Sequence, residues 1–218
     1  MQQLKTIVFG LSANPPTKNH LIFIEYLLGL TSYDLVRVVL SAQSPLKSAA
    51  DYLPAEDRFS LLKAMLEAAS IDFKRCVLER LELERPPPSY MIDTLKALHL
   101  RAEQTGVHEH MTLVLGLDAL GQFTDWYQWD AYGDVCDIKF YPRAGEQMLP
   151  QAIEEQLNIL QNAGIQADFI DNQDLPMGAG SATDARMHYA AGKLGIPDGM
   201  TPEVDQIIRE HGYYGAMS

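Results

Sequence analysis

FGLSANPPTKNHLIFIEYLLG, residues 9–29, joins an apolar strand pattern to an apolar helix pattern through a short polar turn. The strand pattern begins at residue 6, and a second strand pattern follows the helix at residues 35–42. A strand, a helix and a second strand in this order predict a parallel βαβ unit, which is right-handed almost without exception. The turn after the first strand of such a unit is a common place for a ligand.

The rest of the chain continues this alternation of strands and helices. Strand patterns follow at residues 75–85, 111–116, 137–143 and 167–170. Helix patterns begin after Pro54, after the predicted N-cap Ser89, after Ser181 and after Pro202, and another covers residues 153–160. We therefore expect a single domain over residues 1–218 of the α/β class, with an open, mostly parallel, doubly wound sheet covered by helices on both faces.

The charge of the chain limits which partners it can have. The 218 residues include 17 Lys and Arg against 29 Asp and Glu, a formal net charge of −12. Nucleic acid and anionic membranes are therefore not expected as partners, and an anionic ligand must meet cations gathered locally. Cys76 and Cys136 have no C-x-x-C spacing, and neither a signal peptide nor a membrane-spanning run is visible. We expect a cytoplasmic protein whose cysteines only pack.

The turn at residues 10–20 has the residue types that bind phosphate. Gly10 allows the backbone to approach a ligand closely, and Ser12 and the amides after it can donate to phosphate oxygens. Thr17 and His20 lie three residues apart at the predicted start of a helix, so both side chains can reach a ligand at its positive end. The alternative is that Thr17 only caps the helix, and the residue types alone leave both interpretations open.

A second phosphate-binding turn is predicted at GAGSATDAR, residues 178–186. Ser181 and Asp184 have the spacing of a capping box, so the free amides of a new helix can face a phosphate. Arg186 follows one turn later and can add a charge-assisted contact. The alternative is an ordinary capped helix with a solvated arginine.

Residues 17–20, TKNH, resemble the T/H-x-x-H signature of the nucleotidylyltransferase superfamily, and specifically that of the nicotinate or nicotinamide mononucleotide adenylyltransferases. Seven further segments resemble this family in the same order. They are SAQSPLKS with Lys47, EDRFSLLKAM with Arg58, PPPSYMIDTL, LVLGLDALGQFTDWYQW, FYPRAG with Arg143, SATDAR, and EVDQIIREHGYYG, which resembles the C-terminal helix of the family and its aromatic end. The resemblance covers Ile7 to Tyr214 and implies the nucleotidylyltransferase type of Rossmann-like fold.

The resemblance also implies a reaction and a set of roles. The phosphate of a mononucleotide attacks the α-phosphorus of ATP and pyrophosphate leaves, with His20 and Thr17 as the catalytic residues. ATP would be bound by Gly10, Ser12, His20, Ser181, Thr183 and Arg186. The mononucleotide would be bound by Lys47, Arg58, Ser89, Tyr90, Asp118, Trp126, Tyr127 and Arg143. Mg²⁺ would ride mainly on the ATP phosphates, and no protein metal site is expected, since His108 and His110 suit a polar loop better than zinc.

Alternatives remain for the molecule that accepts the AMP group and for whether the protein is an efficient enzyme. The P-S-Y and W-Y segments resemble the branch of NAD biosynthesis that uses nicotinate mononucleotide, whereas T-K-N-H leans toward the branch that also accepts nicotinamide mononucleotide. A phosphopantetheine adenylyltransferase is a further alternative, although the region of Trp126 argues against it. Leu11 and Ala13 depart from the family pattern, as do Asn19 and Gly180, and the first two motivate a weakly catalytic nucleotide-binding sensor or assembly protein. The sequence does not predict an oligomeric state.

Overall fold

A computed structural model of the protein describes residues 3–43, 52–86, 88–142, 149–170, 178 and 180–217. In these ranges six strands form one sheet in the order β3-β2-β1-β4-β5-β6, and every neighbouring pair is parallel. The strands are β1 (Gln3–Leu11), β2 (Leu35–Leu40), β3 (Cys76–Glu79), β4 (His108–Gly116), β5 (Asp137–Tyr141) and β6 (Ala167–Phe169). The predicted parallel α/β sheet is thus confirmed.

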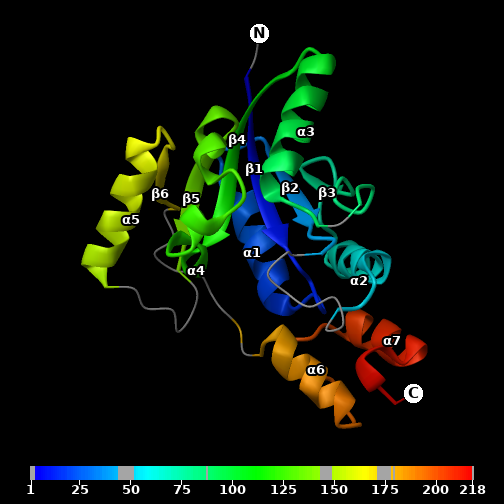
Figure 1. The fold of residues 1–218 in the computed structure, drawn as a ribbon. Coiled ribbons are helices and arrows are strands. Elements are labelled where there is room, and N and C mark those ends of the chain that lie inside the picture. The colour runs from blue at the N-terminus through cyan, green and yellow to red at the C-terminus, as the bar shows by residue number, and fades with distance from the viewer. Residues whose placement is uncertain are drawn as a thin grey trace.

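Helices cover both faces of this sheet (Figure 1). The α-helices are α1 (Lys18–Gly29), α2 (Ala55–Ala68), α3 (Met91–Gln104), α4 (Leu117–Leu120), α5 (Pro150–Asn162), α6 (Ala182–Ala190) and α7 (Pro202–His211). Within the described ranges, three short 3₁₀ segments are η2 (Phe123–Asp125), η3 (Trp129–Asp134) and η4 (Tyr213–Gly215). Along β1, Ile7 and Phe9 belong to one apolar cluster with α1, α2, α6 and α7, whereas Val8 belongs to a second cluster with α3, α5 and η3. Alternate side chains of a strand therefore build the two cores.

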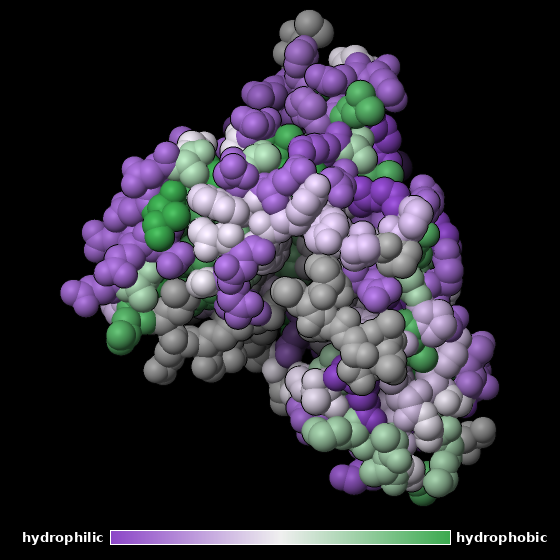
Figure 2. Space-filling model, viewed as in Figure 1, coloured by the Kyte–Doolittle hydropathy of each residue, from purple (hydrophilic) through white to green (hydrophobic). Residues whose placement is uncertain are grey.

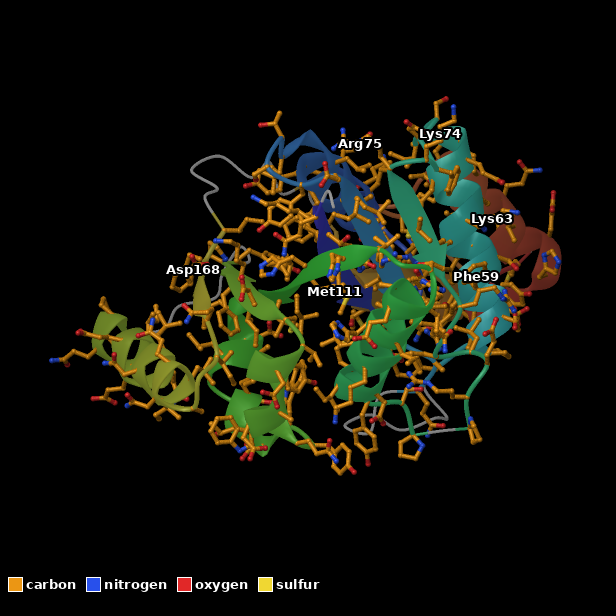
Figure 3. The ribbon with its side chains drawn as sticks, turned by 90° about the horizontal axis from the view of Figure 1, so that it is seen from above. Phe59, Lys63, Lys74, Arg75, Met111 and Asp168 are labelled. Carbon is orange, nitrogen blue, oxygen red and sulfur yellow. The ribbon has the colours of Figure 1, made fainter. Side chains whose placement is uncertain are left out.

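The strand order reverses between β1 and β4. The chain first moves outward from β1 through β2 to β3, and then returns to β4 on the other side of β1 before it continues to β5 and β6. The carboxyl ends of β1 and β4 lie side by side at this reversal, which is where open α/β sheets bind ligands. In Figure 1, α6 and α7 lie beyond these strand ends, below the sheet. Seen from above in Figure 3, Asp168 of β6 marks one side of the sheet, and Phe59 and Lys63 of α2 lie on the other.

The strand predicted at residues 75–85 is shorter than its alternating pattern suggests. β3 ends at Glu79, and a turn follows, in which the amide of Leu83 donates to the carbonyl of Arg80 at 2.8 Å. Glu79 is buried, and its carboxylate is stabilised there by Arg37 of β2 and Arg101 of α3, which donate to it at 2.6 and 2.5 Å. The alternating pattern continues past the strand because Glu82, a polar position of the turn, is itself buried and makes the contacts described below.

Two local predictions were wrong. The N-cap of α3 is Tyr90, not Ser89, so the hydroxyl of Ser89 lies outside the helix. His108 and His110 lie in β4 and not in a loop, because β4 extends along the first residues of β1. The imidazole of His110 is 2.8 Å from the carboxylate of Asp137 on the neighbouring strand β5.

The remaining sequence predictions about the core agree with the structure. Cys76 and Cys136 are free and buried, and burial raises the pKa of the Cys76 thiol to about 11, so it stays a neutral packing group.

Among the helices of the described ranges, none has both the length and the apolar character needed to cross a membrane. In the view of Figure 2, the surface over α3 and α5 is mostly hydrophilic.

Candidate functional site

A cleft of about 1410 Å³ lies at the carboxyl ends of β1 and β4. Ligand pockets for one drug-sized molecule usually measure about 300 to 1,000 Å³, so this cleft has room for two nucleotides. It brings together most of the predicted site residues, namely Gly10, Ser12, Thr17, His20, Ser89, Tyr90, Asp118, Trp126, Tyr127, Ser181, Thr183 and Arg186. Lys47 and Arg143 lie outside the described residues.

His20 faces the cleft with a defined tautomer. Thr17 is the N-cap of α1, and its backbone N–H donates to Nδ1 of His20 at 2.9 Å. A ring nitrogen that accepts a hydrogen bond carries no proton, so the proton of the neutral imidazole is on Nε2. The Oγ1 of Thr17 is also 2.9 Å from Nδ1. The cap of α1 therefore orients His20 as an Nε2–H donor at the positive end of the helix.

Arg58 has a different place from the one predicted. Its side chain is fully buried, and it does not line the cleft. Its guanidinium donates to four backbone carbonyls, those of Ser12 at 2.6 Å, Ser41 at 2.8 Å, Ala42 at 2.6 Å and Leu53 at 2.9 Å. Burial lowers the pKa of the guanidinium, but these carbonyls give the charge acceptors on several sides. Arg58 therefore holds the backbone after β1 and β2 in place behind the cleft.

The second predicted phosphate turn forms at the start of α6. Ser181 is the N-cap, and its Oγ accepts from the amide of Asp184 at 3.1 Å while its own amide donates to the Asp184 carboxylate at 3.2 Å. The predicted capping box is therefore present. The next amides of the first turn have no partner within the helix. Arg186 donates to Oγ1 of Thr183 at 3.1 Å and to the backbone oxygen of Asn14 at 2.6 Å, so it links α6 to the turn after β1.

Asn19 makes a second link between the two turns, which sequence reasoning missed. Its Nδ2 donates to the carbonyls of Gly178 and Gly180, both at 3.2 Å, and its Oδ1 accepts from the amide of Gly178 at 2.7 Å. Gly180 has φ +87° and no room for a side chain, because a Cβ would lie 2.1 Å from the carbonyl oxygen of Asp198. The amide at position 19 was visible in the sequence, but its partners are about 160 residues away.

Aromatic side chains form the wall of the cleft on the side of α3 and α4. The rings of Tyr90 and Tyr127 have centroids 4.5 Å apart. Trp126 is partly buried and packs on Phe123 with centroids 5.1 Å apart. Asp118 is exposed in the first turn of α4, directly after β4. This wall offers flat apolar surfaces for a planar ring and a carboxylate that can accept from hydroxyls.

Glu82 is another residue of the cleft wall that the sequence did not reveal. It is 2% exposed, and its carboxylate accepts from the amide of Ala42 at 3.3 Å and from Oγ1 of Thr94 at 3.1 Å. Burial raises the pKa of the Glu82 carboxyl, and these two hydrogen bonds oppose the rise. Glu82 thus ties the end of β2 to α3. Its alternating sequence context predicted only a strand, so no signal pointed to this contact.

The site also offers little to a protein-bound metal ion. Within the described residues, His, Cys, Asp and Glu side chains form no group of three or more that could hold one. The side-chain oxygens in the cleft wall belong to hydroxyls, amides and single carboxylates, which are hard ligands of the kind that Mg²⁺ accepts.

Comparisons with known proteins found a matching family model and matching relatives. A cytidylyltransferase-like family model matches residues 8–170. A probable nicotinate-nucleotide adenylyltransferase of Bacteroides thetaiotaomicron is 32% identical over 155 residues, which are 69% of this chain and 73% of that protein. A relative with the same description from a Synechococcus strain is 28% identical and covers 98% of this chain and 96% of its own length.

Solved structures show the same fold. Nicotinic acid mononucleotide adenylyltransferase of Plasmodium falciparum, in a complex with NaAD, aligns with a TM-score of 0.76 and 15% sequence identity over 98% of both chains. At this identity the likeness concerns the fold alone. The chain therefore has the Rossmann-like nucleotidylyltransferase fold predicted from its sequence.

The contacts of Arg58 generate a prediction about stability. Arg58→Met should lower the free energy of unfolding by roughly 3 to 5 kcal/mol, because several buried carbonyls lose their donor at once. Lys63→Met introduces the same side chain on an exposed position of the same helix and should change stability by less than about 0.5 kcal/mol. Urea unfolding of both variants measures the difference. Equal stabilities would show that Arg58 does not hold the turn.

Proposed function

Because this chain belongs to the cytidylyltransferase-like family and, within it, to the nicotinate-nucleotide adenylyltransferases, we propose that it transfers the AMP group of ATP to nicotinate mononucleotide and releases pyrophosphate. It is then a nucleotidyltransferase of NAD biosynthesis. The observation that carries the proposal at the level of residues is the orientation of His20 as an Nε2–H donor between two linked helix starts.

The reaction needs a cleft that positions two phosphates. An oxygen of the mononucleotide phosphate forms a bond to the α-phosphorus of ATP, the bond from that phosphorus to the bridging oxygen of the β-phosphate breaks, and pyrophosphate leaves. Little covalent chemistry falls to the protein, so positioning and electrostatic stabilisation supply most of the rate. His20 would donate from Nε2 to the α-phosphoryl oxygens as negative charge grows on them, and Thr17 would hold the ring.

The triphosphate would lie between the starts of α1 and α6. Gly10 lies in the cleft wall, and the positive ends of α1 and α6 favour a phosphate between them. Side-chain donors around them are Ser12, Ser181, Thr183 and Arg186. We propose that ATP enters with Mg²⁺ on its phosphates, so the metal ion is part of the substrate and the protein adds few ligands of its own.

The mononucleotide would lie against the aromatic wall. Trp126 is placed to stack on the pyridine ring, and backbone amides near Tyr90 and Tyr127 can hold its carboxylate. Ser89 is 7% exposed and lies in the cleft wall beside Glu82, and we propose that it contacts the mononucleotide. Asp118 can accept from ribose hydroxyls. Lys47, Arg143 and the cytoplasmic location stay predictions from the sequence, as does the single domain over residues 1–218.

The packing of the departing residues favours an enzyme over a sensor. Leu11 and Ala13 are 7% and 1% exposed and belong to the apolar cluster behind the turn. The side chains of Leu11 and Ala13 therefore pack in the core. Their departure from the family pattern changes packing atoms and not the backbone donors of the turn. The aromatic wall around Trp126 favours a pyridine mononucleotide over the flexible chain of phosphopantetheine. Pyrophosphate release with ATP and a panel of nicotinate mononucleotide, nicotinamide mononucleotide and phosphopantetheine tests the proposal.

The first prediction here concerns His20. His20→Ala should lower turnover by about 10² to 10⁴, because a positioned donor to the transition state is lost, while ATP affinity changes much less. Thr17→Ala should give a milder defect and a stability loss of about 1 kcal/mol from the cap. His99→Ala, on the exposed side of α3, is the control. Turnover, calorimetric ATP affinity and thermal melting are measured, and a folded His20→Ala enzyme with nearly parental turnover would contradict the mechanism.

A second prediction concerns Arg186. Arg186→Ala should raise the Michaelis constant for ATP on the order of tenfold or more, because a charge-assisted phosphate contact and the link to Asn14 are lost together. Arg80→Ala removes an exposed guanidinium that pairs with Glu56 at 2.6 Å, outside the cleft, and should leave ATP use unchanged. Steady-state kinetics at varied ATP compares the two, and the same constants for both variants would remove Arg186 from the ATP site.

A third prediction concerns the acceptor. Nicotinate mononucleotide should have a specificity constant roughly tenfold or more above that of nicotinamide mononucleotide, a difference of about 1.4 kcal/mol, because a neutral amide matches backbone donors less well than a carboxylate. Trp126→Ala should impair both acceptors through lost stacking, whereas Trp129→Ala, outside the cleft wall, should not. A preference for the amide would overturn the assignment of the acceptor.

A further inference from the structure

The turn that follows β1 is held by the last described segment of the chain. Tyr214 lies in η4, and its hydroxyl donates to Oδ1 of Asn14 at 2.7 Å. The same Oδ1 accepts from the backbone amide of Leu53 at 3.3 Å. An amide oxygen with two donors fixes which way the Asn14 side chain is turned.

Asn14 is central to the geometry of this turn. It is 6% exposed and lies in the wall of the cleft. Its backbone oxygen accepts from Arg186 at 2.6 Å, so the same residue receives the side chain of the second phosphate turn. The preceding Ser12 carbonyl is held by Arg58 at 2.6 Å. Three segments, α2, α6 and η4, thus meet on two residues of the turn, Ser12 and Asn14.

The backbone adopts a costly conformation at Tyr214 and at Ala13, the residue next to Asn14. Tyr214 has φ 56° and ψ 19°, and Ala13, directly before Asn14, has φ 45°. Residues other than glycine adopt this left-handed region at a cost in free energy, and such conformations persist where surrounding contacts determine them. The ring of Tyr214 packs nearly parallel to that of Tyr189, with centroids 6.4 Å apart. The fold therefore directs the Tyr214 hydroxyl at Asn14 in spite of a local cost.

We infer that Tyr214 is a positioning residue for adenylyl transfer, which acts through Asn14 on the turn that receives the ATP phosphates. The inference rests on the proposed function and adds to it a residue outside the cleft wall. Without the hydroxyl, Oδ1 of Asn14 loses the shorter of its two described hydrogen bonds, and the turn loses one of its restraints. Gly10, Ser12 and Thr17 are parts of the same turn, so a looser turn reduces the order of the donors around the triphosphate.

The test is Tyr214→Phe, with Tyr213→Phe as the matched control. Both changes remove one hydroxyl from η4, but the hydroxyl of Tyr213 is directed to Asp57 of α2 and away from the turn. Loss of one hydrogen bond corresponds to a factor of roughly 2 to 12, so kcat/KM for ATP should fall about threefold to tenfold in Tyr214→Phe. The Michaelis constant for the mononucleotide and the melting temperature should match those of Tyr213→Phe. Equal kcat/KM values for ATP in both variants would overturn the inference.

A double-mutant cycle tests whether the effect passes through Asn14. In an Asn14→Ala background, Tyr214→Phe should cause no further loss, because the acceptor of its hydrogen bond is already absent. A second loss of the same size would show that Tyr214 acts by another route. If the parental chain releases no pyrophosphate, the proposed function fails, and calorimetric ATP binding then decides the inference by the same comparison of Tyr214→Phe with Tyr213→Phe.

Discussion

The buried guanidinium of Arg58 is the interaction on which the arrangement of the site depends. Polypeptide that leaves a parallel sheet exposes carbonyls that no neighbouring strand can pair. Here three such carbonyls after β1 and β2, together with the carbonyl of Leu53 before α2, converge on one side chain. The charge of Arg58 is tolerated in the interior because these oxygens surround it. The ends of β1 and β2 and the start of α2 are thereby held at fixed positions, and the turn that faces the cleft has a rigid support.

The turn before α1 and the turn before α6 form a single unit, because a side chain from each helix contacts the turn before the other helix. Asn19 of α1 reaches the loop before α6, and Arg186 of α6 reaches the turn before α1. Each link pairs backbone groups that the turns would otherwise leave unsatisfied. Two helix starts with their positive ends directed at one cleft suit a polyphosphate better than a single phosphate.

Electrostatics explains why backbone donors matter in this acidic protein. Of the described residues that line the cleft, Arg186 is the one arginine, and the wall also contains Glu82, Asp118 and Asp125. A chain of net charge −12 cannot attract nucleotides by its overall field. Amides at helix starts carry partial positive charge without an added side chain, and the neutral Nε2–H of His20 donates without requiring a protonated imidazole.

The sequence by itself determined the order of strands and helices, the place of the first turn and the residues of the second, because periodicity, prolines and caps act over a few neighbouring positions. It grouped His20, Trp126 and Arg186 in one site through the motifs of the resemblance, and all three line the same cleft. It misplaced Arg58, since a lone arginine in a sequence gives no sign of whether it meets a phosphate or buried carbonyls. It also missed Asn19, Glu82 and Tyr214. Their partners lie on segments far along the chain, and only the packing of α2, α6 and η4 around the end of β1 decides which atoms meet.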